Sequence, residues 1–315
     1  AMRPMMFLSM IVTLSLSLLI GCGSTSMLVP VTRPAEINLK GYNKIAVGTI
    51  TGRAGQDLAD DLLNALVNSG RFEVLDRQHL NDLLREQDLT RAGYADSVHG
   101  GKVGGLVGAA VMVAGRVTIY KYEEKMKRDP SVDKNGHKHV SNTRYGTATI
   151  SSNLQLTNIA TGRVITSKRF DRTAEAKTYG HDREPDRIDP DGLLASAREI
   201  VASDFMKKIA PYREMVRVSL LKDSDIPEFE EGIGLAERGE WERAAEVFKS
   251  VTVTHPGSDK AFYNFGVALE YSYLFPEALE ALQKAYRLNA DDDYQKEMSN
   301  VRRMESEQKR LEEQG

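Results

Sequence analysis

Histidines are the residues of this sequence whose type and spacing could bind a metal ion. His137 and His139 are separated by one residue in the charged stretch NGHKHV, and His181 is a third candidate ligand. Imidazole nitrogens bind zinc-type ions, so a metal site is conceivable, but histidines in charged loops are more often solvated. No cysteine is available to complete such a site, and we therefore expect none.

Catalytic motifs are missing from the sequence. There is no Gly-x-Ser-x-Gly nucleophile motif, and the glycine-rich run at 100–108 lacks the spacing of a phosphate-binding loop. We therefore predict no catalytic and no cofactor-binding residues, and a protein that is not an enzyme.

Cys22 is the only cysteine of the chain, and it ends the sequence LIGC at 19–22. The apolar run at 7–20 follows the positive charge of Arg3. Its 14 residues are few for a membrane span, which needs about 20, but typical of a signal peptide. The sequence LIGC resembles the lipobox of bacterial lipoproteins, in which the cysteine thiol receives diacylglycerol before cleavage. The resemblance implies a signal peptide at 1–21 and diacylglycerol and N-acyl lipid on Cys22; an ordinary signal peptide is the alternative.

The residue after the lipidated cysteine indicates whether a lipoprotein is held in the inner or the outer membrane. In the enterobacterial sorting rule an aspartate there retains lipoproteins in the inner membrane, and here the residue is Gly23. We therefore expect an outer-membrane lipoprotein, anchored by its lipid on the periplasmic side. Residues 22–40 contain Ser, Thr and Pro, and we predict that they form the lipidated N-terminus and a tether.

Composition and apolar spacing predict a globular α/β domain at 41–222. Hydrophobic residues make up 41% of the chain, which is enough for a buried core, and a net charge of −3 gives no basic surface for nucleic acid. Short apolar or period-two runs predict strands at 44–50, 72–75, 111–120 and 216–221, and a hairpin from 147–157 and 162–170. Helical spacing of apolar residues predicts helices at 58–67, 80–84 and 193–209.

A resemblance adds detail to this domain. Residues 65–87 (ALVNSGRFEVLDRQHLNDLLREQ) resemble the signature stretch of the CsgG-like family: a helix ending at Ser-Gly, a strand, an acidic-Arg pair and a Leu-rich helix. Residues 108–110 match the family's Gly-Ala-Asp landmark except that the third residue is Ala110. The resemblance covers about 44–209 and implies a sandwich with a mixed sheet. Family members include the curli secretion channel and periplasmic activators of peptidoglycan synthases.

The C-terminal part contains an internal repeat. Three pairs of small or bulky residues are each separated by 34 positions: Gly232 and Gly266, Ala244 and Ala278, and Phe248 and Leu282. A period of 34 with these residue types resembles the tetratricopeptide repeat, a pair of closely packed helices. We predict two such repeats at 225–290, with these six residues packing the helices. We expect a charged helix at 291–315 to cap them. The fold class is thus α+β, followed by an all-α repeat domain.

Two functions remain open. The first is a lipid-anchored, non-enzymatic interaction or assembly factor for a cell-envelope complex, which binds a protein partner through both domains as a monomer or a homo-oligomer. The alternative is a subunit of an oligomeric CsgG-like secretion channel, with membrane hairpins at 121–144 and 167–192. These stretches have 11 charged residues in 24 and 13 in 26, without alternating apolar residues. A lipid-facing strand needs that alternation, so we favour the first function.

Overall fold

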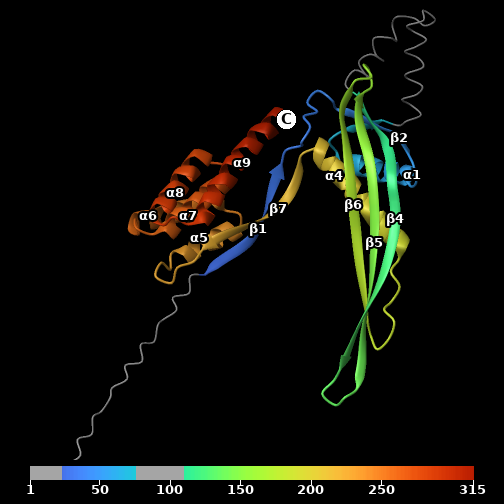
Figure 1. Ribbon diagram of the computed structural model, residues 1–315. Helices are drawn as coiled ribbons and strands as arrows, with labels where there is room; N and C mark the ends of the chain where they lie inside the picture. Colours follow the sequence, from blue (N-terminus) through green and yellow to red (C-terminus); the bar gives the residue numbers. More distant parts are fainter. Residues whose placement is uncertain (1–22, 76–109) are drawn as a thin grey trace, which may run out of the picture. The chain divides into compact units, whose positions relative to one another are not determined.

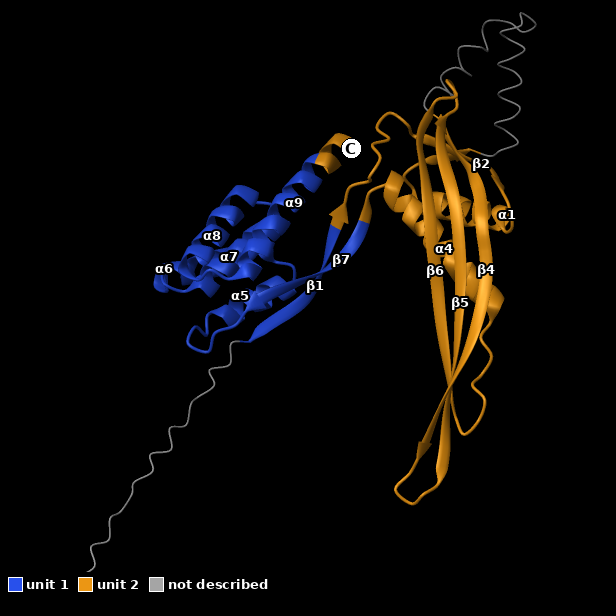
Figure 2. Cartoon of the chain, in the orientation of Figure 1, with its two compact units in different colours: residues 1–31, 213–309 blue, residues 32–212, 310–315 orange. Residues whose placement is uncertain are grey.

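The computed structural model describes residues 23–75 and 110–315. The chain divides into two compact units (Figure 2). The repeat unit takes residues up to Val31 together with Arg213–Lys309, and the α/β unit takes Thr32–Tyr212 together with Arg310–Gly315. Each unit has its own hydrophobic core.

The α/β unit is built on a mixed sheet. Within the described residues the strand order is β3-β2-β4-β5-β6. Strand β2 is parallel to β3 and β4, whereas β5 is antiparallel to β4 and β6. The strands are β2 (Lys44–Thr51), β3 (Glu73–Leu75), β4 (Ala110–Val132), β5 (Lys138–Asn158) and β6 (Val164–His181). This mixed sheet confirms the predicted fold class, and β5 and β6 form the predicted hairpin.

Helices α1 (Gly55–Ser69) and α4 (Pro190–Ile209) complete the core of this unit. They lie on the same side of the long strands (Figure 1) and contact each other. Leu58, Leu62 and Leu66 of α1 recur every fourth residue and are fully buried, because that spacing keeps them on one helical face. Helix α4 begins at an N-cap, where the side chain of Asp189 accepts a hydrogen bond from the Asp191 backbone N–H.

The charged stretch at 121–144 forms the far half of the β4–β5 hairpin, which we call the hairpin arm. Its turn is held by Asp133 Oδ1, which accepts backbone hydrogen bonds from Asn135 and His137, both at 2.8 Å. Residues 167–181 of the second charged stretch lie in β6. The sequence pattern predicted strand only up to residue 170 of the second stretch and none at 121–144, and His139 lies on β5 rather than in a loop. Most side chains at 121–132 are solvent-exposed, so no apolar period marks them.

Strands β1 (Ser24–Arg33) and β7 (Tyr212–Leu221) form a two-stranded ribbon, most of which belongs to the repeat unit. The Lys222 N–H donates to the Gly23 carbonyl at 2.8 Å, and the hydroxyls of Ser26 and Ser219 are 2.9 Å apart. Two predictions are therefore wrong: residues 24–33 are a strand rather than a tether, and residues 213–221 do not belong to the α/β unit. The physical reason is burial, because Val29, Val218 and Leu220 of the ribbon join the core of the repeat helices.

The helices of the repeat unit are α5 (Phe229–Glu237), α6 (Trp241–Thr254), α7 (Asp259–Tyr271), α8 (Phe275–Leu288) and most of α9 (Asp292–Gln314). Helix α9 buries one stripe at intervals of three or four residues: Tyr294, Met298, Val301 and Met304. That stripe packs into the same core as the preceding helices. No helix in the described ranges is both long enough and apolar enough to cross a membrane.

Candidate interaction site

All six residues predicted to pack the repeats are buried, and the structure brings them together in two equivalent places. A Cβ atom added to Gly232 of α5 would lie 2.5 Å from Phe248 Cε1 of α6. One added to Gly266 of α7 would lie 2.6 Å from Leu282 Cγ of α8. Both distances are too short for real atoms, so the missing side chain is what lets each helix pair approach. Ala244 and Ala278 are fully buried in the second helix of each pair.

A groove of about 500 Å³ opens on the repeat unit beside β1. Its walls are five successive residues of β1, the turn between α5 and α6, and two tyrosines at the end of α7: residues 27–31, 236–239, 241–242, Tyr271 and Tyr273. Successive strand residues point to opposite faces of a strand. A wall that includes all five therefore runs along the edge of β1.

The walls of this groove combine fixed and exposed apolar groups. Trp241 stacks on Tyr271 with ring centroids 4.8 Å apart, and the buried Trp241 joins this part of the wall to the core of the repeat unit. Leu28 is 61% exposed and Tyr273 is 55% exposed, so both are available to a partner. Charged residues line the groove beside them at Glu237, Arg238 and Glu242.

The outer edge of β1 adds backbone groups to this surface. In the described part of the chain β1 pairs with β7 alone. The other edge of β1 therefore presents N–H and C=O groups that an extended peptide can pair with. Pro30 lies in β1, which fits an edge strand because proline lacks the N–H that an interior strand would need. Sequence reasoning missed this site because it assigned these residues to a tether.

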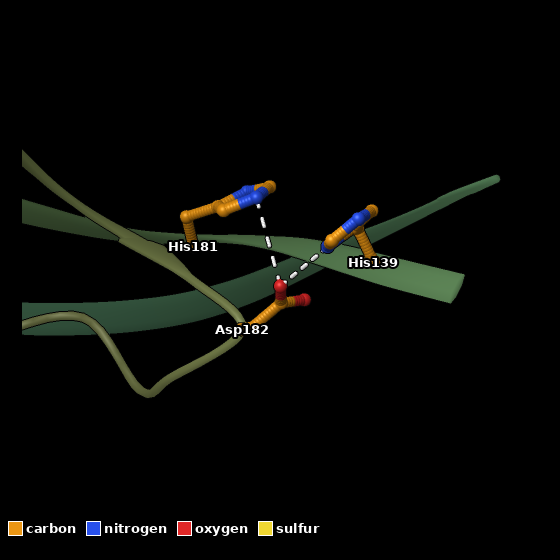
Figure 3. A group of neighbouring side chains, drawn as sticks. All are labelled: His139, His181 and Asp182. Carbon is orange, nitrogen blue, oxygen red and sulfur yellow. Dashed lines mark hydrogen bonds and ion pairs between the residues drawn. The ribbon is translucent and has the colours of Figure 1, made fainter. Parts of the chain in front are cut away.

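A second group of polar side chains lies near the end of the hairpin arm, where His139, His181 and Asp182 converge (Figure 3). His139 Nδ1 is 2.6 Å from Asp182 Oδ2, and His181 Nε2 is 3.6 Å from the same oxygen. The hydrogen bond between His139 and Asp182 raises the pKa of His139 and lowers the pKa of Asp182. Among the described residues, these three form a group whose ligand atoms lie close enough together to hold one metal ion. Sequence reasoning named His139 and His181 as candidate ligands but missed Asp182, which lies beside them only because β5 pairs with β6.

Some predicted features lie outside the described residues: Cys22, the helix at 80–84 and the glycine-rich run at 100–108. The lipidation of Cys22 therefore stays a prediction.

The fold defines an α/β domain with a mixed sheet, joined to a helical repeat unit. Residues 37–180 match the family model described as "Curli production assembly/transport component CsgG". This match confirms the CsgG-like resemblance for residues 37–180, and the C-terminal helices fit the predicted tetratricopeptide repeats.

Solved structures provide more distant likenesses. MamA 41-end from Desulfovibrio magneticus RS-1 is 22% identical, with a TM-score of 0.24; the match covers 28% of this chain and 50% of that one. A PelC dodecamer from Paraburkholderia phytofirmans is 16% identical over 59% of this chain and 99% of that one, with a TM-score of 0.24. The LpoB C-terminal domain from Salmonella enterica is 17% identical over 41% and 82%, with a TM-score of 0.21. The comparison with curated proteins gave no match.

Proposed function

We propose that this protein is an outer-membrane lipoprotein, anchored through Cys22 on the periplasmic side, that acts as a non-enzymatic assembly factor for a cell-envelope complex. The observation that carries the proposal is the groove of the repeat unit, where the exposed side chains of Leu28 and Tyr273 lie beside an edge of β1 that no other described strand pairs with. The partner is a protein with an extended, partly apolar segment. That segment pairs with the edge of β1 and places its apolar side chains against Leu28 and Tyr273.

The physical chemistry of the groove supports this kind of partner. Full burial of one large apolar side chain contributes about 1.5–3 kcal/mol, and Leu28 and Tyr273 are both exposed enough to gain from it. Main-chain hydrogen bonds to β1 would add affinity with little dependence on the sequence of the partner. The stacked pair Trp241 and Tyr271 is already ordered, so binding would cost little side-chain entropy there.

The position of β1 also supports an anchored interaction unit. Strand β1 begins at Ser24, so only Gly23 separates it from Cys22. A lipid on Cys22 would therefore be attached almost directly to the repeat unit. Each buried methylene of an acyl chain contributes about 0.8 kcal/mol, and two or three chains give stable attachment. The groove would then be held close to the membrane surface rather than at the end of a long flexible linker.

Cross-linking in intact cells, followed by purification of the full-length protein and identification of the attached protein, tests this function. We expect Leu28→Glu and Tyr273→Ser to abolish the cross-linked product. Val253→Glu is the matched control, because Val253 is 75% exposed on α6 of the same unit but does not line the groove. The proposal fails if the control abolishes the product as strongly as the groove variants, or if neither groove variant changes it.

A secretion-channel subunit is the second candidate, because the description of the matched family names transport and the β4–β5 hairpin is long. The charges on the arm argue against membrane insertion. On one face of β4, Lys121 pairs with Glu123 at 3.0 Å and Lys127 with Asp129 at 2.9 Å. On the other face Glu124 pairs with Arg144 of β5. Both faces therefore carry charges, whereas a membrane strand needs one apolar face.

Conductance separates the two candidates. We expect the full-length protein to give no stable conductance in planar bilayers. Deletion of residues 123–141 should leave its membrane association intact, because the lipid provides it. Discrete conductance steps that disappear on this deletion would favour the channel.

A further inference from the structure

We propose that His139, His181 and Asp182 form a binding site for a divalent transition-metal ion of the zinc type near the end of the hairpin arm. His139 lies on β5, His181 is the last residue of β6, and Asp182 directly follows it. Their ligand atoms lie within 4.8 Å of one another. Figure 3 shows both imidazoles beside the same carboxylate oxygen.

Strand pairing places the two histidines on one face of the sheet. Ser141 of β5 is opposite His181 of β6. His139 lies two residues before Ser141, and side chains two residues apart in a strand share a face. His139 and His181 are therefore diagonal neighbours, which matches the 5.2 Å between their stacked rings.

Backbone hydrogen bonds fix the carboxylate of Asp182 in place. Its N–H donates to the Val140 carbonyl at 2.9 Å, and its Oδ1 accepts from the Val140 N–H at 2.6 Å. Asp182 also has a left-handed backbone with φ of 53°, which a residue other than glycine rarely adopts. One carboxylate oxygen is thus bound to β5, and Oδ2 is left facing the two imidazoles. A ligand whose orientation is set in advance loses little entropy on binding.

The distances suit a tetrahedral ion after small movements. Zinc lies about 2.0–2.2 Å from nitrogen and oxygen ligands, so two ligand atoms of a tetrahedral site are about 3.3 Å apart. The separation of His181 Nε2 and Asp182 Oδ2, 3.6 Å, is already close to this value. The hydrogen bond of 2.6 Å between His139 and Asp182 must lengthen by less than about 1 Å. His181 is solvent-exposed, and water would take the fourth position.

A second carboxylate is placed to support His139. Asp133 Oδ2 is 3.7 Å from His139 Nε2, the ring nitrogen that a metal at Nδ1 would leave protonated. Metal-binding histidines usually donate their other N–H to such a group. The hairpin turn holds Asp133 through the backbone N–H groups of Asn135 and His137. Two imidazoles in the donor set favour zinc, copper or nickel over magnesium and calcium, which prefer oxygen ligands.

Calorimetric titration of the full-length protein in detergent with Zn²⁺ tests the site. We expect His139→Ala, His181→Ala and Asp182→Asn each to weaken binding at least ten-fold. His255→Ala is the matched control, because it removes one histidine from the repeat unit and should leave the affinity unchanged. The proposal is overturned if the wild type does not bind Zn²⁺, or if the ligand variants bind it as tightly as the control.

A second measurement distinguishes a lost ligand from a damaged fold. In the presence of EDTA, the ligand variants and the wild type should have the same circular dichroism spectrum and closely similar melting temperatures. Zn²⁺ should then raise the melting temperature of the wild type and of His255→Ala, but not that of His139→Ala or His181→Ala, because only a bound ion stabilises the folded state. Equal shifts in all four proteins would place the ion elsewhere and refute the assignment.

Discussion

The side-chain amide of Asn264 on α7 hydrogen-bonds both backbone polar groups of Leu221 at the end of β7. Its Nδ2 donates to the Leu221 carbonyl at 2.8 Å, and its Oδ1 accepts from the Leu221 N–H at 2.8 Å. Asn264 is fully buried. Its amide therefore supplies the two hydrogen bonds that another strand would make, and it ties the ribbon to the repeat helices.

Asn264→Ala should destabilise the repeat unit by about 2–4 kcal/mol, because it leaves two backbone groups without partners. Urea unfolding followed by tryptophan fluorescence measures this directly, since the only tryptophan of the chain, Trp241, lies in this unit. Asn300→Ala is the control, because that amide hydrogen-bonds side chains of its own helix, Glu297 and Arg303. An equal loss of stability in both variants would contradict the bridging role of Asn264.

Gly232→Ala and Gly266→Ala should each destabilise the repeat unit by about 1–3 kcal/mol, because the added methyl group overlaps Phe248 or Leu282. Gly234→Ala provides a contrast within α5, since its Cβ would have a nearest neighbour at 3.7 Å. That variant should be more stable by about 0.5–1 kcal/mol, because alanine favours a helix over glycine. Urea midpoints that rise in all three variants would show that the helix pairs are not closely packed.

Glu36 should make the stability of the α/β unit depend on pH. It contacts Lys168 of β6 at 2.7 Å and also Lys208 of α4, and these two lysines lower the pKa of Glu36 from its ordinary 4.5 to about 2. Because the pKa of Glu36 is lower in the folded state than in the unfolded state, its ionised form stabilises the fold. This stabilisation is complete above pH 4.5 and is lost as the pH falls towards 2.

Glu36→Gln should remove this part of the pH dependence and cost up to about 1 kcal/mol at neutral pH, since the carboxylate is half-exposed. Thermal melting followed by circular dichroism at several pH values measures it, and added salt should reduce the difference between variant and wild type. Parallel pH profiles of the two proteins would show that the ion pairs contribute nothing.

Cys22→Ser should abolish lipid attachment and release the protein from the membrane, because the proposed acceptor of the diacylglycerol is the thiol of Cys22. Metabolic labelling with a palmitate analogue measures attachment, and fractionation of the cells measures release. The sequence contains no second cysteine that could accept the lipid in place of Cys22. Undiminished label in the serine variant would reject the lipoprotein prediction.

Elements with a buried apolar face could be predicted from the sequence. The leucines of α1 recur at helical spacing, which predicts the helix. The apolar run at 111–113 predicts a strand, and it lies in the first half of β4. The close contacts of the repeat helices followed from the 34-residue spacing of glycines and larger residues.

Two kinds of element escaped prediction for physical reasons. The β4 part of the hairpin arm, 121–132, is solvent-exposed on both faces and therefore shows no apolar period. The approach of His139 to His181 depends on a strand register that no local pattern encodes. In β1, Val29 and Val31 alternate with exposed residues, but the Ser, Thr and Pro content suggested a tether. Period-two burial was the signal that could have identified this strand.

The ribbon of β1 and β7 has a consequence for the order in which the chain acquires structure. Residues 34–211 lie between the two strands, so the ribosome makes about 180 residues after β1 before it reaches β7. At about 5–20 residues per second, β1 waits roughly 10–35 s for its partner. Closing so long a flexible loop is entropically costly, and prior folding of the inserted unit would reduce that cost. Strand β1 is therefore made long before β7 and cannot take its place in the ribbon until β7 follows.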